Sequence, residues 1–125
     1  MRWLVDGNNV MGARPDGWWR DREGAMARLV TALQAFADDS GDPVAVVFDG
    51  REREVGQAAA PDVTVGFAPG GRDAADHAIA RRVAGDGDPA TLTVVTSDRE
   101  LAQRVRAAGA QVTGAGAFRS RLPEP

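Results

Sequence analysis

The sequence contains no cysteine, no lysine and a single histidine, His77. Without cysteine the chain can form neither a disulfide nor a thiolate metal site, and this composition fits a reducing compartment. No apolar run approaches the roughly 20 residues that a membrane-spanning helix needs. No apolar signal segment follows Met1 and Arg2 either. We therefore expect a cytoplasmic protein that has no membrane partner.

The chain has no excess of positive charge, since its formal net charge is −3. A strongly basic domain would point directly to nucleic acid, and this chain does not. All 15 basic residues are arginines. Arginine grips phosphate through a planar fork, but a GC-rich genome produces the same bias without any selection for binding. The 125 residues, of which 43% are hydrophobic, predict one globular domain over residues 1–125.

Apolar strands alternate with amphipathic helices along the chain. The predicted strands are residues 3–5, 43–48, 63–67, 92–95 and a short one at 110–113. Predicted helices cover residues 21–41, 73–84 and 97–109, with one or two further turns at 115–122. Asp21 and Gly41 are the expected ends of the first helix, and the Ser97–Glu100 spacing predicts a capping box for the third. This alternation predicts a parallel sheet between two layers of helices. The link over residues 49–61 is short for a crossover and shows no clear helical pattern.

Aspartates follow three of the predicted strands. Asp6, Asp49 and Asp98 come after the first, second and fourth strands, and Asp73 and Asp76 begin the second helix. In an open parallel sheet the carboxyl ends of all strands lie at one edge, which holds the binding crevice. We therefore expect these acids to gather there.

Gathered carboxylates repel one another. Two unit charges about 4 Å apart repel by roughly 4 kcal/mol at an effective dielectric near 20. Helix capping explains Asp98 and Asp73 but not Asp6 or Asp49. A divalent cation would neutralise the cluster, and oxygen ligands without Cys or His companions favour Mg²⁺ or Mn²⁺. The alternative is that each acid is a turn or cap residue.

The stretch after the first strand, DGNN, raises a similar choice. Gly7 would allow a sharp turn beside Asp6, and Asn8 would stabilise that turn. Asn9 would hold either the Asp6 carboxylate or a substrate phosphate. The structural alternative is that both amides cap backbone groups.

Other residues carry weaker indications. Trp18 and Trp19 could stack on bases or could close a loop over the core, and Arg51 and Arg72 could contact phosphates or simply be solvated. Ser97 could touch substrate but needs no function beyond capping, and a lone helical His77 is usually a packing residue. The remaining arginines near the expected crevice are Arg14, Arg20, Arg22 and Arg53.

Four motifs occur in a fixed order along the chain: VDGNNVMG, VVFDG, AADHAI and VVTSDREL. Together they resemble the NYN domains, which are PIN-like nucleases, and in particular the YacP-like branch. The resemblance implies a PIN-like three-layer α/β/α sandwich with a mostly parallel sheet of strand order 3-2-1-4-5. It also implies a cluster that binds Mg²⁺ or Mn²⁺ and cuts RNA.

Carried over by motif, Asp6, Asp76 and Asp98 match the family's metal ligands, and Asp49 matches a more variable acid. Asn9 matches the family amide near the first acid. The family often has a carboxylate after the helix acid, where this chain has His77. Ribosome association is known in parts of the branch and is not implied for this chain.

These indications predict a divalent-metal-dependent endoribonuclease acting on single-stranded RNA or mRNA. Asp6, Asp76, Asp98 and Asp49 form its catalytic set, and Asn8, Asn9, Ser97, Arg51, Arg72 and Trp18 its substrate-binding set. The resemblance implies that cleavage leaves 3′-hydroxyl and 5′-phosphate ends. The alternative is a catalytically weak RNA-binding or regulatory module of the same fold. An aspartyl-phosphate phosphatase is disfavoured, because the position two residues after Asp49 is Arg51 rather than an acid.

Overall fold

A computed structural model of the chain describes residues 1–55, 62–71 and 73–123. Its centre is a sheet of five parallel strands in the order β3-β2-β1-β4-β5. The strands are β1 (Arg2–Asp6), β2 (Val44–Asp49), β3 (Val63–Ala68), β4 (Leu92–Val95) and β5 (Gln111–Thr113). The predicted fold class and strand order are therefore confirmed.

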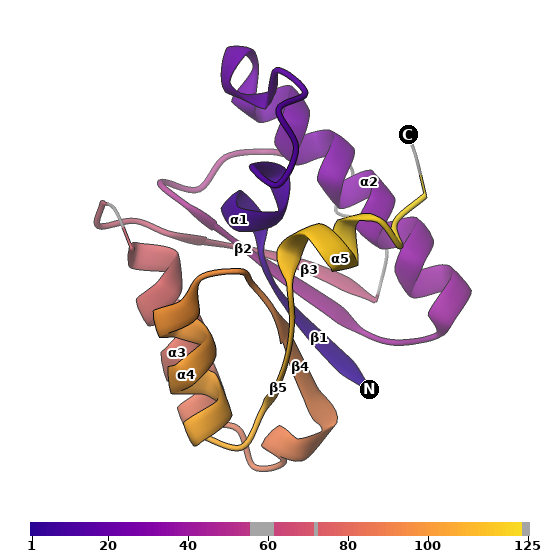
Figure 1. The fold of residues 1–125 in the computed structure, drawn as a ribbon. Coiled ribbons are helices and arrows are strands. Elements are labelled where there is room, and N and C mark those ends of the chain that lie inside the picture. The colour runs from indigo at the N-terminus through magenta and orange to yellow at the C-terminus, as the bar shows by residue number, and fades with distance from the viewer. Residues whose placement is uncertain (56–61, 72, 124–125) are drawn as a thin grey trace.

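Helices cover both faces of this sheet. They are α1 (Gly7–Met11), α2 (Arg22–Ser40), α3 (Ala74–Ala84), α4 (Arg99–Ala107) and α5 (Ala115–Arg119), with short 3-10 turns η1 (Trp18–Arg20) and η2 (Pro89–Thr91). Figure 1 shows α3 and α4 together on one face and α2 with α5 on the other. No helix in the described ranges is long and apolar enough to span a bilayer.

Alternation along β1 divides the core in two. Trp3 and Val5 pack with α2 and α5, whereas Leu4 packs with α3 and α4. This division follows from the pleat, which sends successive side chains to opposite faces of a strand. Both faces of the central strands are covered, as their continuous apolar composition predicts.

The caps of α2 are confirmed, but those of α3 and α4 differ from expectation. Asp21 accepts a hydrogen bond from the Gly24 N–H at 3.0 Å, and Gly41 ends α2 in the left-handed region. The capping box at α4 was predicted to begin at Ser97, and this is wrong: Asp98 is the N-cap and accepts from the Leu101 N–H at 2.9 Å.

At α3 the expected capping by Asp73 is also absent. Asp73 makes no side-chain cap hydrogen bond. The Asp49 carboxylate at the end of β2 accepts from the Ala75 N–H instead, at 2.8 Å. A residue distant in sequence therefore satisfies a donor at the helix start. Of the link after β2, residues 50–55 contain no helix or strand and residues 56–61 lie outside the described ranges.

A sharp turn was expected at Gly7. In the structure Gly7 is instead the first residue of the helix α1. Gly7 is not among the glycines with positive φ, so conformational freedom does not explain it. A Cβ at this position would lie 2.6 Å from two ring carbons of Phe48 and 2.9 Å from Val46 Cγ2. Glycine is needed here because α1 packs closely on β2.

We predict that Gly7→Ala lowers the free energy of unfolding by about 1–3 kcal/mol, because the added methyl overpacks a fully buried ring. Urea unfolding measures the change. Gly116→Ala is the matched control, because no atom lies within 4 Å of its added Cβ and alanine is the better helix former. Equal stability of Gly7→Ala and wild type would contradict the packing explanation.

Candidate active site

Three aspartates meet at the carboxyl edge of the sheet. Asp6 and Asp49 end β1 and β2, and Asp98 follows β4 and begins α4. Because β2, β1 and β4 are neighbours in the sheet, the three strand ends are adjacent. The edge predicted from the alternation of strands and helices is therefore the place where the structure puts these residues.

Two amides of α1 tie the strand ends together. The side-chain oxygen of Asn8 accepts from the Asp49 N–H, and that of Asn9 accepts from the Ser97 N–H, both at 2.7 Å. Asn8 thus links β1 to β2, and Asn9 links β1 to the segment after β4. These contacts match the structural alternative, in which both amides bond to backbone groups. A substrate role for the amides stays a prediction. Because the amide oxygens already accept backbone hydrogen bonds, the NH₂ groups would contact the substrate.

Asp6 is buried, with only 4% of its surface exposed. Its carboxylate accepts a hydrogen bond from the Thr96 hydroxyl at 3.1 Å, and the Asn9 N–H lies near enough to lower its pKa. Burial and then the negative charges of Asp76 and Asp49 raise the pKa of Asp6 to about 7, against the lowering effect of these two donors. Both donors are neutral, so the described residues supply no cation to this carboxylate.

Asp76 lies in the first turn of α3 and is half-buried. Burial raises its pKa, and the nearby charges of Asp98, Asp73 and Asp49 raise it further. Asp76 is therefore within electrostatic range of the acids at the strand ends. The Asp76 and Asp6 carboxylates repel each other when both are ionised. This repulsion was predicted for a cluster of acids at this edge.

Thr96 is a site residue that the sequence argument missed. It is 1% exposed, and its hydroxyl donates to Asp6 while accepting from the Asp98 N–H at 3.1 Å. One hydroxyl thereby positions two of the predicted metal ligands. The signal was available in the sequence, since Thr96 is the polar residue between the apolar strand and the SD pair.

Within the described ranges, no group of three or more His, Cys, Asp or Glu side chains could hold a metal ion. The donor chemistry nevertheless fits Mg²⁺ or Mn²⁺. These ions take oxygen ligands, and Mg²⁺ commonly uses only one or two carboxylates with water and substrate oxygens completing its shell. A buried carboxylate that faces other carboxylates is the kind of group a cation stabilises. The ligand set Asp6, Asp76 and Asp98 stays a prediction.

The other predicted substrate residues are more scattered. The Ser97 hydroxyl accepts from the Ala115 N–H at 2.9 Å and so anchors the start of α5. Arg51 is exposed after β2, and Arg72 lies outside the described residues. Trp18 lines a separate cavity beside α2. His77 is exposed and contacts Arg104 of α4, with 3.4 Å between the ring nitrogen and the guanidinium.

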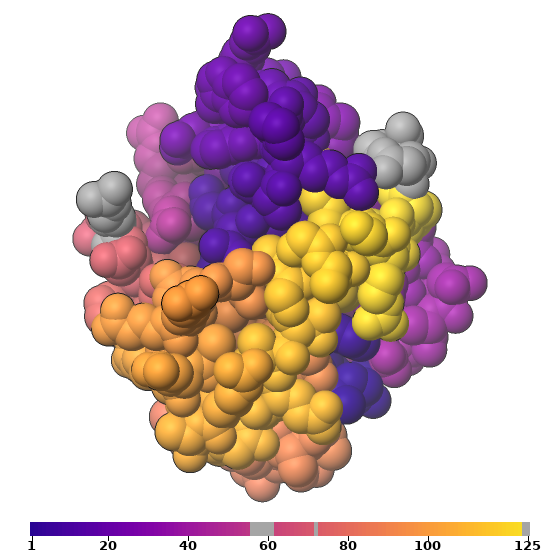
Figure 2. Space-filling model, viewed as in Figure 1, coloured from indigo at the N-terminus to yellow at the C-terminus, as the bar shows by residue number. Residues whose placement is uncertain are grey.

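Figure 2 shows how this edge looks from outside: the start of α4 lies beside the segment that contains α1, and the η1 region projects at the top. The hydrogen bond between Asn9 and Ser97 crosses this junction. Arg99 and Arg106 line a shallow hollow of about 380 Å³ with Ser97 and Asp98. Positive side chains therefore border the acids on the α4 side.

We predict that, without metal, Asp6 makes stability fall as pH rises. Its folded pKa of about 7 exceeds the ordinary 3.8, so the folded state gains a proton that the unfolded state lacks between these values. The resulting stability is fully present below pH 4 and is lost as pH rises through about 7. The loss is at most on the order of 4 kcal/mol.

Melting temperatures in EDTA from pH 4 to 8 test this expectation. Asp6→Asn should flatten the profile and be more stable than wild type at pH 8. Asp62→Asn, an exposed acid beside β3, should follow the wild-type profile. Parallel profiles for wild type and Asp6→Asn would contradict the assigned burial effect.

A second prediction concerns Thr96. Thr96→Val leaves the Asp6 carboxylate and the Asp98 N–H without their shared partner, so it should cost about 1–3 kcal/mol of unfolding free energy. Thr96→Ser keeps the hydroxyl and should lose less. Chemical denaturation compares the two variants, and a larger loss in Thr96→Ser would exclude the hydrogen-bonding role.

Comparison with known proteins agrees with the fold of the chain. The sequence matches the YacP-like NYN domain over residues 3–124. The fold is similar to a mutant of Rae1 (YacP) from Bacillus subtilis, with a TM-score of 0.73 and 27% identity over 97% of this chain and 77% of that one. The unmutated Rae1 (YacP) from Bacillus subtilis gives a TM-score of 0.68 and 24% identity over 97% and 76%.

No curated protein gives a significant match. The matched family covers nearly the whole chain, and the motif residues at the carboxyl edge of the sheet lie within the match. The chain belongs to the YacP-like NYN domain family, whose fold is nuclease-like.

Proposed function

We propose that the chain is a divalent-metal-dependent endoribonuclease. The observation that carries the proposal is the buried Asp6 carboxylate, which lies within electrostatic range of Asp76 and Asp49 and, among the described residues, accepts a hydrogen bond only from the neutral Thr96 hydroxyl. Such a group is costly without a cation. The nuclease-like family supports RNA as the substrate, and single-stranded RNA or mRNA in the cytoplasm is part of the proposal.

Asp6, Asp76 and Asp98 are the residues that would hold the ion. When bound, Mg²⁺ or Mn²⁺ supplies activation of water and charge stabilisation at the phosphodiester. The Asp98 carboxylate accepts from the Leu101 N–H through Oδ1, and the Asp49 carboxylate accepts from the Ala75 N–H through Oδ1. Within the described residues, the second oxygen of each carboxylate accepts no hydrogen bond. These helix bonds fix the carboxylates before substrate arrives.

The surrounding residues position the acids. The Thr96 hydroxyl orients the Asp6 carboxylate, and Asn8 and Asn9 hold the strand ends at a fixed spacing. Preorganised charge of this kind contributes to catalysis because it need not rearrange during the reaction. Arg99 and Arg106 border the same hollow as Asp98 and would meet the phosphates of a bound strand, since arginine binds phosphate through its fork.

We expect purified protein to cleave single-stranded RNA in Mn²⁺ and to lose this activity in EDTA. Asp6→Asn and Asp98→Asn should each lower kcat by at least about 100-fold, because each removes several kcal/mol of transition-state stabilisation. Gel analysis of end-labelled RNA measures cleavage and identifies 5′-phosphate ends. Asp62→Asn should retain wild-type rates.

Metal binding can be read independently of activity. Mn²⁺ should raise the melting temperature of the wild type and not that of Asp6→Asn, because a ligand that binds the folded state stabilises it. Full cleavage by Asp6→Asn would exclude the assigned site. RNA binding without any cleavage in Mn²⁺ or Mg²⁺ would instead favour the alternative of an RNA-binding module.

A further inference from the structure

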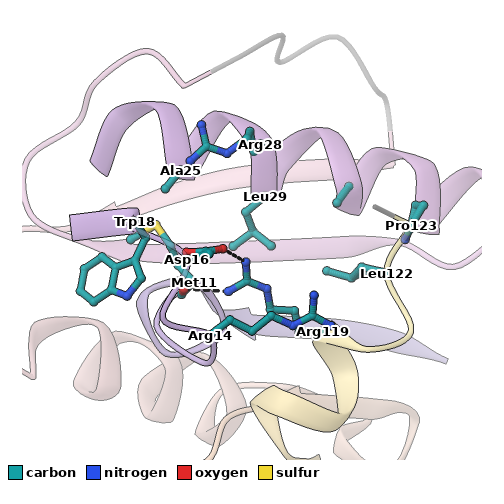
Figure 3. Close-up of a pocket in the computed structure, with 11 residues that line it drawn as sticks. Met11, Arg14, Asp16, Trp18, Ala25, Arg28, Leu29, Arg119, Leu122 and Pro123 are labelled. Atoms are coloured by element: carbon teal, nitrogen blue, oxygen red, sulfur yellow. Dashed lines mark hydrogen bonds and ion pairs between the residues drawn. The ribbon is translucent and has the colours of Figure 1, made fainter. Parts of the chain in front are cut away.

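A second cavity lies on the other side of α1 from the acids. It encloses about 190 Å³ and is bounded by α2 above and by α1 and α5 below, as Figure 3 shows. Its apolar wall is made by Met11, Leu29 and Leu122. The volume is below that of typical drug-sized sites, so the cavity suits one planar ring rather than a large ligand.

Positive charge is concentrated at this cavity although the chain as a whole is negative. Three arginines line it, namely Arg14, Arg28 and Arg119, against one acid, Asp16. Arg119 is held by Asp16 and by the α1 carbonyls of Val10 and Met11, the latter at 2.8 Å. The Asp16 charge is therefore already matched by Arg119.

Arg28 is placed to meet an incoming anion. It lies on the exposed surface of α2, and no ion pair joins it to any residue of the described ranges. Arg28 therefore places a positive charge that no ion pair matches, within the described residues, beside the apolar wall of the cavity. That combination is complementary to a group with a planar ring and a phosphate.

Trp18 supplies an aromatic surface at one end of the cavity, where Figure 3 shows its ring. The ring is half-buried and packs against the core. The Arg22 guanidinium lies 5.4 Å from its centroid, and Trp19 contacts it edge-on at 5.9 Å. Core packing holds the ring, so a base could stack on it with little loss of side-chain entropy. Trp19, by contrast, is 49% exposed and lines no part of the cavity.

The cavity lies close enough to the acids for one RNA strand to reach both. Asp6 is the N-cap of α1 and Met11, its last residue, lines the cavity. At about 1.5 Å per residue the five-residue helix spans about 8 Å. A stacked strand at about 3.4 Å per nucleotide covers this distance with two or three nucleotides.

We propose that this cavity is a nucleotide subsite that takes one base of the RNA strand against Trp18 and its phosphate at Arg28. The inference rests on the proposed nuclease function for the identity of the strand. A free mononucleotide offers the same chemistry, and the experiment separates the two sources. The subsite would set where along the RNA the acids cut, because it anchors the strand a short distance from Asp6.

Binding is measured in EDTA by fluorescence anisotropy of a labelled single-stranded RNA octamer, with the full chain. Trp18→Leu keeps an apolar wall but removes the aromatic face, and it should weaken binding by about 10-fold or more. Arg28→Ala should weaken binding similarly and lower the salt dependence by about one counterion. Because Arg28 is exposed, this second variant tests the subsite even if Trp18→Leu folds poorly.

The matched controls are Trp19→Leu, which removes the neighbouring exposed ring, and Arg82→Ala, which removes an exposed arginine of α3 that lines a hollow at the amino-terminal edge of the sheet. Both should stay within 2-fold of wild type. Competition by adenosine or uridine monophosphate that is lost in Arg28→Ala would show a subsite that also accepts free nucleotides. Absence of competition, with the same losses for RNA, would show a subsite for a nucleotide of the strand only.

Equal affinities of the cavity variants and the controls would overturn the subsite. In cleavage assays, Trp18→Leu should raise KM about 10-fold with kcat within 2-fold of wild type, because the lost contact is the same in ground and transition states. If wild type cleaves and both cavity variants match it, only the subsite proposal fails. If no protein cleaves but RNA binding depends on Trp18 and Arg28, only the nuclease proposal fails.

Discussion

The carboxyl ends of β2, β1 and β4 are held at a fixed spacing by two amide side chains, and the candidate site depends on this constraint. Asn8 and Asn9 are consecutive residues of a single helical turn, yet they bond to opposite neighbours of β1. Each replaces a backbone partner that the strand ends would otherwise lack. Without these bonds the acids at the edge could separate and relieve their repulsion.

Stability and site geometry are coupled at this edge because the same side chains serve both. Asp49 caps α3 and Asp98 caps α4, so their charges are stabilised in part by helix N–H donors. The Asp6 side chain makes no cap hydrogen bond to its helix, and Asp6 is the most buried of the three. The electrostatic cost therefore falls chiefly on Asp6, where a cation would have the largest effect.

The short helix α1 connects the edge that holds the acids with the cavity that contains Trp18. Asp6 is the N-cap residue at its start, and its last carbonyls accept hydrogen bonds from Arg119 of α5. The close approach of Gly7 to Phe48 fixes its position on β2. The same helix thus helps to place the acids and to shape the cavity that contains Trp18. Because the helix is short, the acids and the cavity are separated by a distance that a few nucleotides of RNA could span.

The sequence by itself determined the sheet, the strand-end acids and the family. Hydrophobic periodicity and the positions of Asp6, Asp49 and Asp98 are local signals, so they could be read without coordinates. The tertiary structure alone decided which partner each polar group meets. Asp49 rather than Asp73 caps α3, Thr96 joins Asp6 to Asp98, and Gly7 is required by contact with Phe48. These contacts join residues that are distant in the sequence. Periodicity and motifs are local patterns, so they do not predict which distant residues come into contact.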